Sequence, residues 1–128
     1  MTRRHTGKPV RVLLADDHRL FAEALEAVLA TEERIDVVGR AADGGEAVAL
    51  ARELEPDVVA LDISMPVLDG FEAAAELELL PRPPAVLILT GSNAPEDVER
   101  ARRARVQGYI TKDAIAAKLV DAILAAAR

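Results

Sequence analysis

Five polar residues that together could handle a phosphoryl group stand at the ends of short apolar runs. Asp16 and Asp17 follow the first run, Asp62 the third, Thr90 the fourth and Lys112 the fifth. Three carboxylates brought together repel one another unless a cation lies between them, and hard oxygen ligands of this charge suit Mg²⁺. A carboxylate nucleophile, neutralising cations and a hydroxyl donor are the parts that phosphoryl transfer requires. Asp62 is the natural acceptor, provided that the fold brings these residues together.

The apolar runs predict five buried strands. They are rich in β-branched and aliphatic residues, and segments with helical spacing separate them. The predicted strands are Val10 to Ala15, Ile35 to Ala41, Val58 to Leu61, Ala85 to Leu89 and Gly108 to Thr111. This alternation predicts an α/β fold with a doubly wound five-stranded parallel sheet, right-handed crossovers and helices on both faces. In such folds ligands bind at the carboxyl ends of the strands, where the five polar residues stand.

The predicted helices differ in how clearly they show an apolar face. The first helix carries an apolar stripe of Phe21, Leu25, Val28 and Leu29, and the last carries Ile115, Leu119 and Ile123. Each stripe gives its helix a face to pack on the sheet. The helices between them are rich in alanine and have weaker patterns.

Capping residues, glycines and prolines mark the helix boundaries. The predicted starts are Gly44 with Gly45, Asp69 with Gly70, and Asn93 with Pro95 and Glu96, and Asp113 is expected to cap the fifth helix. Proline cannot continue a helix, so the expected stops are Pro56 for the second helix and Pro81, Pro83 and Pro84 for the third.

Length and composition narrow the class of protein. A chain of 128 residues has the size of one domain and can bury an ordinary core without a disulfide or structural metal. It has no cysteine, which excludes thiolate metal sites and cysteine nucleophiles and fits a reducing cytoplasm. Acidic residues outnumber basic ones by 22 to 16, and the formal charge of −6 disfavours direct contact with DNA.

The N-terminal residues Met1 to Pro9 are basic and carry no apolar stretch that could form a signal peptide or a membrane span. We expect a flexible tail over residues 1–9, to which we assign no function, and a single domain over residues 10–128. We also expect a soluble, cytoplasmic protein with no membrane partner.

Each of the five polar residues also has an ordinary structural interpretation, because aspartates at strand ends often cap helices and loop lysines are usually solvated. Their joint placement at separate strand ends favours a site. A flavin- or nucleotide-binding domain needs a glycine- or hydroxyl-rich phosphate loop after the first strand, where this chain has Asp16-Asp17-His18. An interaction module with a vestigial acidic cluster predicts neither Mg²⁺ binding nor phosphoryl uptake.

Two motifs resemble those of the response-regulator receiver family of two-component signalling systems. The run Leu61-Asp62-Ile63-Ser64-Met65-Pro66-Val67-Leu68-Asp69-Gly70 is similar to the family's signature around its phosphorylated aspartate. The run Gly108-Tyr109-Ile110-Thr111-Lys112 is similar to its fifth-strand signature, and all five polar residues match its pattern. The resemblance extends from Val10 to the end of the chain and implies the flavodoxin-like (βα)5 receiver fold.

The resemblance implies a metal site and an acceptor. Mg²⁺ is expected on Asp17, Asp62 and the backbone carbonyl of Ser64, with Asp16 close by or acting through water. Haloacid-dehalogenase-like phosphatases, which also form an aspartyl phosphate, have a second aspartate where this chain has Ser64. A receiver therefore fits this sequence better than such a phosphatase does.

The resemblance also implies how the phosphoryl group is delivered and sensed. A sensor histidine kinase is the expected donor, and the domain catalyses its own phosphorylation and dephosphorylation on Asp62 without being a turnover enzyme. Lys112 and Thr90 are expected to bind phosphoryl oxygens. Thr90 then moves toward the added charge and Tyr109 turns inward, which changes the face made by the fourth helix, fifth strand and fifth helix.

The Asp-Asp-His start, which includes His18, is similar to receivers of the NarL and LuxR type, which precede a DNA-binding domain. Control of transcription is therefore expected through an output domain absent from this chain, and a stand-alone receiver acting by protein contact is the alternative.

His18 is expected to open a helix and is left out of the site. Arg105 replaces a glycine that is usual at the end of the fourth helix. A homodimer is possible, and the oligomeric state is left open.

Overall fold

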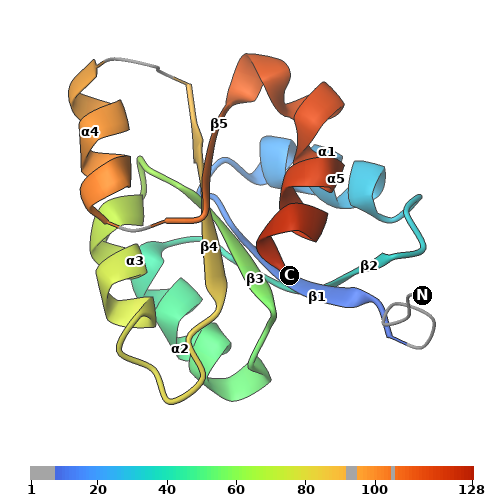
Figure 1. The fold of residues 1–128 in the computed structure, drawn as a ribbon, viewed down its shortest axis with the longest axis horizontal. Helices are drawn as coiled ribbons and strands as arrows, with labels where there is room; N and C mark the ends of the chain where they lie inside the picture. Colours follow the sequence, from blue (N-terminus) through green and yellow to red (C-terminus); the bar gives the residue numbers. More distant parts are fainter. Residues whose placement is uncertain (1–7, 92–94, 105) are drawn as a thin grey trace.

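Five parallel strands form one sheet in the order β2-β1-β3-β4-β5 (Figure 1). The computed structural model describes residues 8–91, 95–104 and 106–128, so residues 1–7 of the predicted tail lie outside it. The strands are β1 Val10–Ala15, β2 Ile35–Ala41, β3 Val58–Asp62, β4 Ala85–Thr90 and β5 Gly108–Thr111. The helices are α1 Arg19–Leu29, α2 Gly44–Leu54, α3 Gly70–Leu77, α4 Pro95–Arg103 and α5 Ile115–Ala126, and a 3₁₀ turn, Lys112–Ala114, precedes α5. The predicted α/β architecture is confirmed, with β3 and β4 each extended by one residue.

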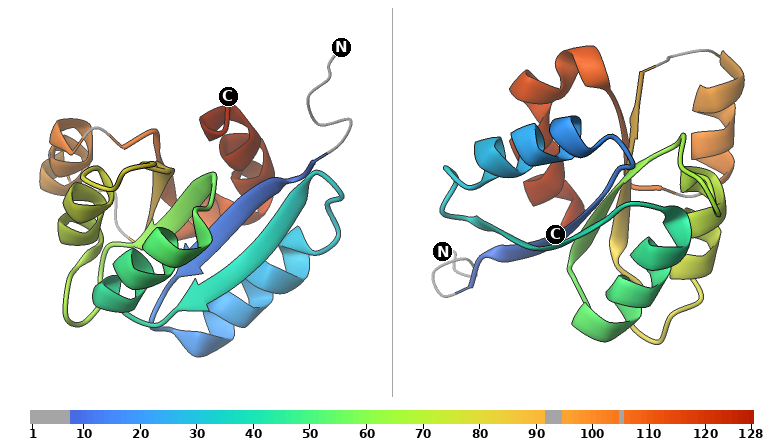
Figure 2. Two further views of the ribbon diagram at one scale, coloured as in Figure 1. Left: turned by 90° about the horizontal axis from the view of Figure 1, so that it is seen from below. Right: turned by 180° about the vertical axis from the view of Figure 1, so that it is seen from behind.

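Helices cover both faces of the sheet, with α1 and α5 on one face and α2, α3 and α4 on the other (Figures 1 and 2). Successive side chains of a strand point to opposite faces, so Leu13 and Ala15 join one core while Val12 and Leu14 join the other. Two cores explain why the central strands are continuous apolar runs rather than alternating ones. Within the described part of the chain, no helix is long and apolar enough to cross a membrane.

Two helices begin at aspartate caps followed by glycine. The Asp43 carboxylate accepts a 2.7 Å hydrogen bond from the backbone N–H of Glu46 at the start of α2. Asp69 and Glu72 form a reciprocal capping box at the start of α3, with hydrogen bonds of 2.8 and 2.9 Å. Such caps satisfy backbone donors that have no partner inside the helix. The sequence prediction of both starts is confirmed.

Two expectations about the helices are wrong. Asp113 does not cap α5, because the chain first makes a 3₁₀ turn and Ala114 takes the cap position without a side-chain bond. Val28 is 46% exposed, since at 100° per residue it lies at the edge of the stripe that buries Leu25 and Leu29. The predicted start at Asn93 and the unusual Arg105 lie outside the described residues.

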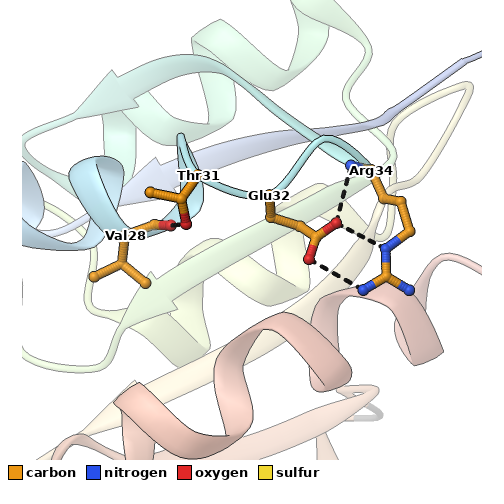
Figure 3. A network of polar contacts seen from close by, with 4 residues as sticks. All are labelled: Val28, Thr31, Glu32 and Arg34. Atoms are coloured by element: carbon orange, nitrogen blue, oxygen red, sulfur yellow. Dashed lines mark hydrogen bonds and ion pairs between the residues drawn. The ribbon is translucent and has the colours of Figure 1, made fainter.

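The turn between α1 and β2 is held by local polar contacts (Figure 3). The Thr31 hydroxyl donates to the Val28 carbonyl at 2.8 Å, and the Arg34 guanidinium donates to the Glu32 carboxylate at 2.7 and 3.0 Å. The hydrogen bonds from Arg34 lower the pKa of Glu32 to about 2. The turn is thus stabilised by a charged pair directly before the edge strand β2.

Candidate functional site

Three carboxylates meet at the carboxyl ends of β1 and β3. One oxygen each from Asp16, Asp17 and Asp62 lies within 4.8 Å of the others. Asp16 and Asp62 are buried, with 5% exposure each, whereas Asp17 is exposed. A divalent cation between them would contact hard oxygen ligands and retain access to water on the Asp17 side, which is the coordination that Mg²⁺ favours. The predicted acidic cluster is therefore assembled by the fold.

Asp62 stands on a rigid support. All five residues of β3 are buried, and β3 is hydrogen-bonded to β1 on one side and β4 on the other. The backbone N–H of Ser64 donates a hydrogen bond to the Asp62 carboxylate, and the Ile63 N–H donates to the Leu89 carbonyl at 3.1 Å. The backbone on both sides of Asp62 is thus fixed by its neighbours.

Close packing of two helix starts also positions the loop after β3. A Cβ atom on Gly70 would lie 2.6 Å from the carbonyl oxygen of Asp62, and one on Gly44 would lie 2.2 Å from the carbonyl oxygen of Leu68. Any larger residue would have to displace backbone at these positions. Glycine therefore lets α3 and α2 lie close to the loop of residues 63–69 that follows Asp62, which we call the acceptor loop.

Lys112 connects the acidic residues to the far strand. Its Nζ lies 3.3 Å from Asp16 Oδ2 and 3.5 Å from Asp62 Oδ1, although Lys112 is distant from both in the sequence. The same Nζ lies 4.4 Å from the centroid of the Phe21 ring, which belongs to α1. The lysine predicted from the end of β5 is thus in contact with two of the three carboxylates.

The electrostatic environment raises the pKa of Asp62 above its ordinary value. Burial is the largest cause, and the neighbouring charge of Asp16 adds to it. The Lys112 ammonium and the Ser64 N–H act in the opposite direction but do not cancel the rise. The cluster without a cation therefore carries unfavourable negative charge, which a bound cation would relieve.

Thr90 and Tyr109 lie on the neighbouring strands β4 and β5. Thr90 ends β4 and is 1% exposed, and Tyr109 is half-buried. Burial raises the pKa of Tyr109, while a hydrogen bond with the Thr90 side chain acts in the opposite direction. The two residues predicted to act as a switch are thus linked to each other.

The structure brings together Asp16, Asp17, Asp62 and Lys112, and it places Thr90 at the adjacent strand end. The Ser64 side chain is exposed, and the metal contact expected of its carbonyl stays a prediction. Sequence reasoning missed Phe21 as a neighbour of Lys112, since it was assigned only to an apolar stripe. No pattern along the chain indicates this contact, because it depends on how α1 packs beside the end of β5.

His18 opens α1, as expected, and its backbone rather than its ring serves the site. The His18 N–H donates to Asp16 Oδ1 at 2.8 Å, which fixes the orientation of that carboxylate. The His18 side chain is in no described hydrogen bond to the cluster and stacks near Phe21 instead.

Comparison with known proteins identifies the family. A family model for the response regulator receiver domain matches residues 12–124. The transcriptional regulatory protein LiaR of Bacillus subtilis is 38% identical over 119 residues, which are 93% of this chain and 56% of LiaR. The chain thus spans about half the length of this curated relative.

Solved structures agree with this assignment. The receiver domain of the putative response regulator NarL from Mycobacterium tuberculosis superposes with a TM-score of 0.89 at 35% identity, covering 94% of this chain and 97% of that one. A chain of the CheX-CheY-BeF3-Mg²⁺ complex from Borrelia burgdorferi gives a TM-score of 0.84 at 25% identity, covering 94% and 90%. The chain therefore belongs to the response regulator receiver domain family, and its relatives include regulators of the NarL and LuxR type.

Proposed function

We propose that this domain accepts a phosphoryl group on Asp62 in a Mg²⁺-dependent reaction. The observation that carries the proposal is the meeting of three carboxylates and the Lys112 ammonium at the ends of strands β1, β3 and β5. Mg²⁺ would be held by Asp17, Asp62 and the Ser64 carbonyl, with Asp16 beside it, and would neutralise charge on the transferred group. The match to a complex that contains BeF3 and Mg²⁺ supports the same chemistry.

The donor in this proposal is a phosphohistidine of a sensor histidine kinase. An oxygen of the Asp62 carboxylate attacks phosphorus, the P–N bond breaks, and the histidine ring takes the electron pair. Lys112 and Thr90 bind the phosphoryl oxygens, so the pocket is complementary to the charge that accumulates there. Water later hydrolyses the aspartyl phosphate, and the domain serves as a timed switch rather than a turnover enzyme.

The signal leaves the site through Thr90. In the structure Thr90 bonds with Tyr109, and a phosphoryl oxygen on Asp62 would compete for the same hydroxyl. Loss of that bond frees Tyr109 to turn inward and changes the surface made by α4, β5 and α5. This is the proposed output surface.

The wider role in this proposal is control of transcription in the cytoplasm. LiaR is named as a transcriptional regulatory protein and is about twice as long as the matched region. By analogy, a receiver over residues 10–128, preceded by a short tail, would act through a DNA-binding output domain, with the acidic receiver making no DNA contact of its own.

Intact mass spectrometry with acetyl phosphate tests the proposed reaction. We expect one added phosphoryl mass in the presence of Mg²⁺, none with a chelator, and none for Asp62→Asn. Asp57→Asn is the matched control, because Asp57 is exposed and precedes the same strand at its opposite end. Absence of the added mass from folded protein, or equal labelling of Asp62→Asn, would contradict the proposal.

A further inference from the structure

The Lys112 ammonium has a neutral partner as well as two charged ones. Its Nζ lies 4.4 Å from the Phe21 ring centroid, 3.3 Å from Asp16 Oδ2 and 3.5 Å from Asp62 Oδ1. A lysine side chain is a flexible stem, and three contacts from different elements are what define the position of its end. The face of an aromatic ring attracts an ammonium at this distance, more strongly where water is partly excluded. The Lys112 side chain is 24% exposed, so the contact is partly shielded.

Phe21 is itself held in place. It lies in the first turn of α1, is half-buried, and packs against the core between α1, α5 and the sheet. The His18 ring lies nearly parallel to it, with 6.4 Å between centroids and 15° between planes. The ring therefore presents a fixed face toward the carboxyl ends of the strands.

The three partners of Lys112 differ in what the reaction does to them. The proposed function, on which this inference rests, places the cation on Asp62 with Asp16 beside it, and converts Asp62 to an acyl phosphate. Both carboxylates are then less available to the ammonium. The ring of Phe21 takes part in neither change, so its attraction for Lys112 persists through the whole cycle.

We propose that Phe21 is a positioning residue that keeps the Lys112 ammonium beside the acceptor while the cation and the phosphoryl group occupy the carboxylates. It acts through Lys112 and does not touch the reacting atoms. The alternative is that Phe21 only fills the core, in which case an aliphatic residue of similar size serves equally well.

Phe21→Leu separates these roles, because leucine retains most of the apolar volume and removes the ring. We expect the rate of Asp62 phosphorylation by acetyl phosphate at saturating Mg²⁺ to fall about two- to tenfold. Phe21→Tyr retains the aromatic face and is expected to restore a rate within about twofold of the original protein. A rate for Phe21→Leu equal to that of Phe21→Tyr would overturn the proposal.

A second measurement reports the position of Lys112 without any phosphorylation. Methylene protons held over a ring face are shifted upfield in NMR spectra, and Lys8 and Lys118, which are both exposed, serve as internal references. We expect upfield Cε protons for Lys112 alone, and their return to the reference position in Phe21→Leu. Phe71→Leu is the matched control, since its ring lies 4.3 Å from the Arg100 guanidinium and has no described contact with Lys112.

The two readouts distinguish failure of this inference from failure of the proposed function. If the original protein takes up no phosphoryl group but Lys112 shows the ring shift, the acceptor proposal fails and the contact stands as a structural one only. If phosphorylation proceeds and the Lys112 protons are unshifted, or shifted equally in Phe21→Leu, the positioning role of Phe21 is wrong.

Discussion

The strand and helix on either side of the acceptor loop, β3 and α3, are more deeply packed than α4 and β5, two of the three elements of the proposed output surface. Every residue of β3 is buried, and α3 buries five residues, namely Gly70, Phe71, Ala73, Ala74 and Leu77. Within Pro95–Arg103, by contrast, α4 buries Ala101 alone, and β5 buries only Ile110 and lies at the edge of the sheet. Asp62 thus stands on a rigid support, whereas α4 and β5 bury few apolar side chains and can move at a lower cost in free energy.

Polar contacts attach α4 and the start of β5 to the neighbouring elements. The Arg100 guanidinium of α4 lies 3.4 Å from Asp69 Oδ2 and 4.3 Å from the Phe71 ring centroid, both on the α3 side. Before β5, Gln107 bonds twice to Val86 of β4, through its N–H at 2.8 Å and its side-chain oxygen at 2.6 Å. Such contacts can be exchanged at lower cost than a buried apolar core can be repacked. This difference in packing suits a domain in which a charge is added at Asp62 and the surface at α4 and β5 responds.

The largest expected effect contrasts a buried apolar residue of β3 with an exposed one of α4. Leu61→Ala in β3 removes a fully buried side chain and is expected to lower the free energy of unfolding by about 2–5 kcal/mol. Val98→Ala in α4, where Val98 is 45% exposed, is expected to change it by about 0.5 kcal/mol or less. Urea unfolding measures both, and similar losses for the two variants would refute the contrast.

The charge of Asp62 gives the second effect. An acid whose pKa is raised in the folded state binds more protons there than in the unfolded chain, so its contribution to stability falls as pH rises from 3.8 to the raised value. Asp62→Asn does not titrate and is therefore expected to be more stable than the original protein at pH 7 without a cation. Mg²⁺ at ten times its Kd should stabilise the original protein by about 1.4 kcal/mol.

Urea unfolding across this pH range, with and without Mg²⁺, checks both statements. The gain in the free energy of unfolding from Asp62→Asn should grow as the pH rises from 3.8 to the raised pKa of Asp62 and then level off. Mg²⁺ should stabilise this variant less than it stabilises the original protein. A metal-free Asp62→Asn protein that is less stable than the original at pH 7 would show that the ionised Asp62 carboxylate does not destabilise the fold.

Asp69→Ala tests the attachment of α4. It removes the cap of α3 and the ion pair with Arg100, whereas the control Asp43→Ala removes a cap of α2 that has no described contact with α4. Each lost cap is expected to cost about 1 kcal/mol. Hydrogen exchange in α4 should accelerate in Asp69→Ala only, and equal acceleration in both variants would mean that Arg100 does not hold α4.

The smallest effect concerns the acceptor loop, where Val67 adopts a left-handed backbone conformation with φ of 72°. A β-branched residue is strained there, by about 1–2 kcal/mol, and the 77% exposed side chain gains little from packing. Glycine relieves the strain but loses about 0.5–1 kcal/mol in chain entropy. We expect Val67→Gly to stabilise the protein by about 0.5 kcal/mol in urea unfolding, and a clear loss of stability would show that the loop needs the valine side chain.

Most of the fold could be predicted from the sequence because its signals are local. Continuous apolar runs such as Val10–Ala15 indicate strands buried on both faces, and Asp69 followed by glycine indicates a capped helix start. The prediction that Asp113 caps α5 failed for the same reason, since a local signal does not reveal that a 3₁₀ turn precedes this helix.

The site could be predicted only in part, because some of its contacts join residues that no local pattern relates. Strand-end placement was enough to group Asp16, Asp62 and Lys112 at one edge. The contact of Lys112 with Phe21 depends on how α1 packs beside the end of β5, which spacing along the chain does not specify. The strained φ of Val67 was equally hidden, because valine is not a residue that a left-handed turn favours.

The most direct test of this account is to follow backbone amide chemical shifts on adding Mg²⁺ and beryllofluoride, which mimics the phosphoryl group. We predict shifts at Asp62 and Lys112 that extend through Thr90 to Tyr109 and α4, while the end of α2 at Leu54 and the start of β2 at Ile35 stay unchanged. Asp62→Asn is expected to show no response to beryllofluoride. Beryllofluoride-induced shifts that are absent from the folded protein, or that persist in Asp62→Asn, would contradict the claim that Asp62 receives the phosphoryl group and changes α4 and β5.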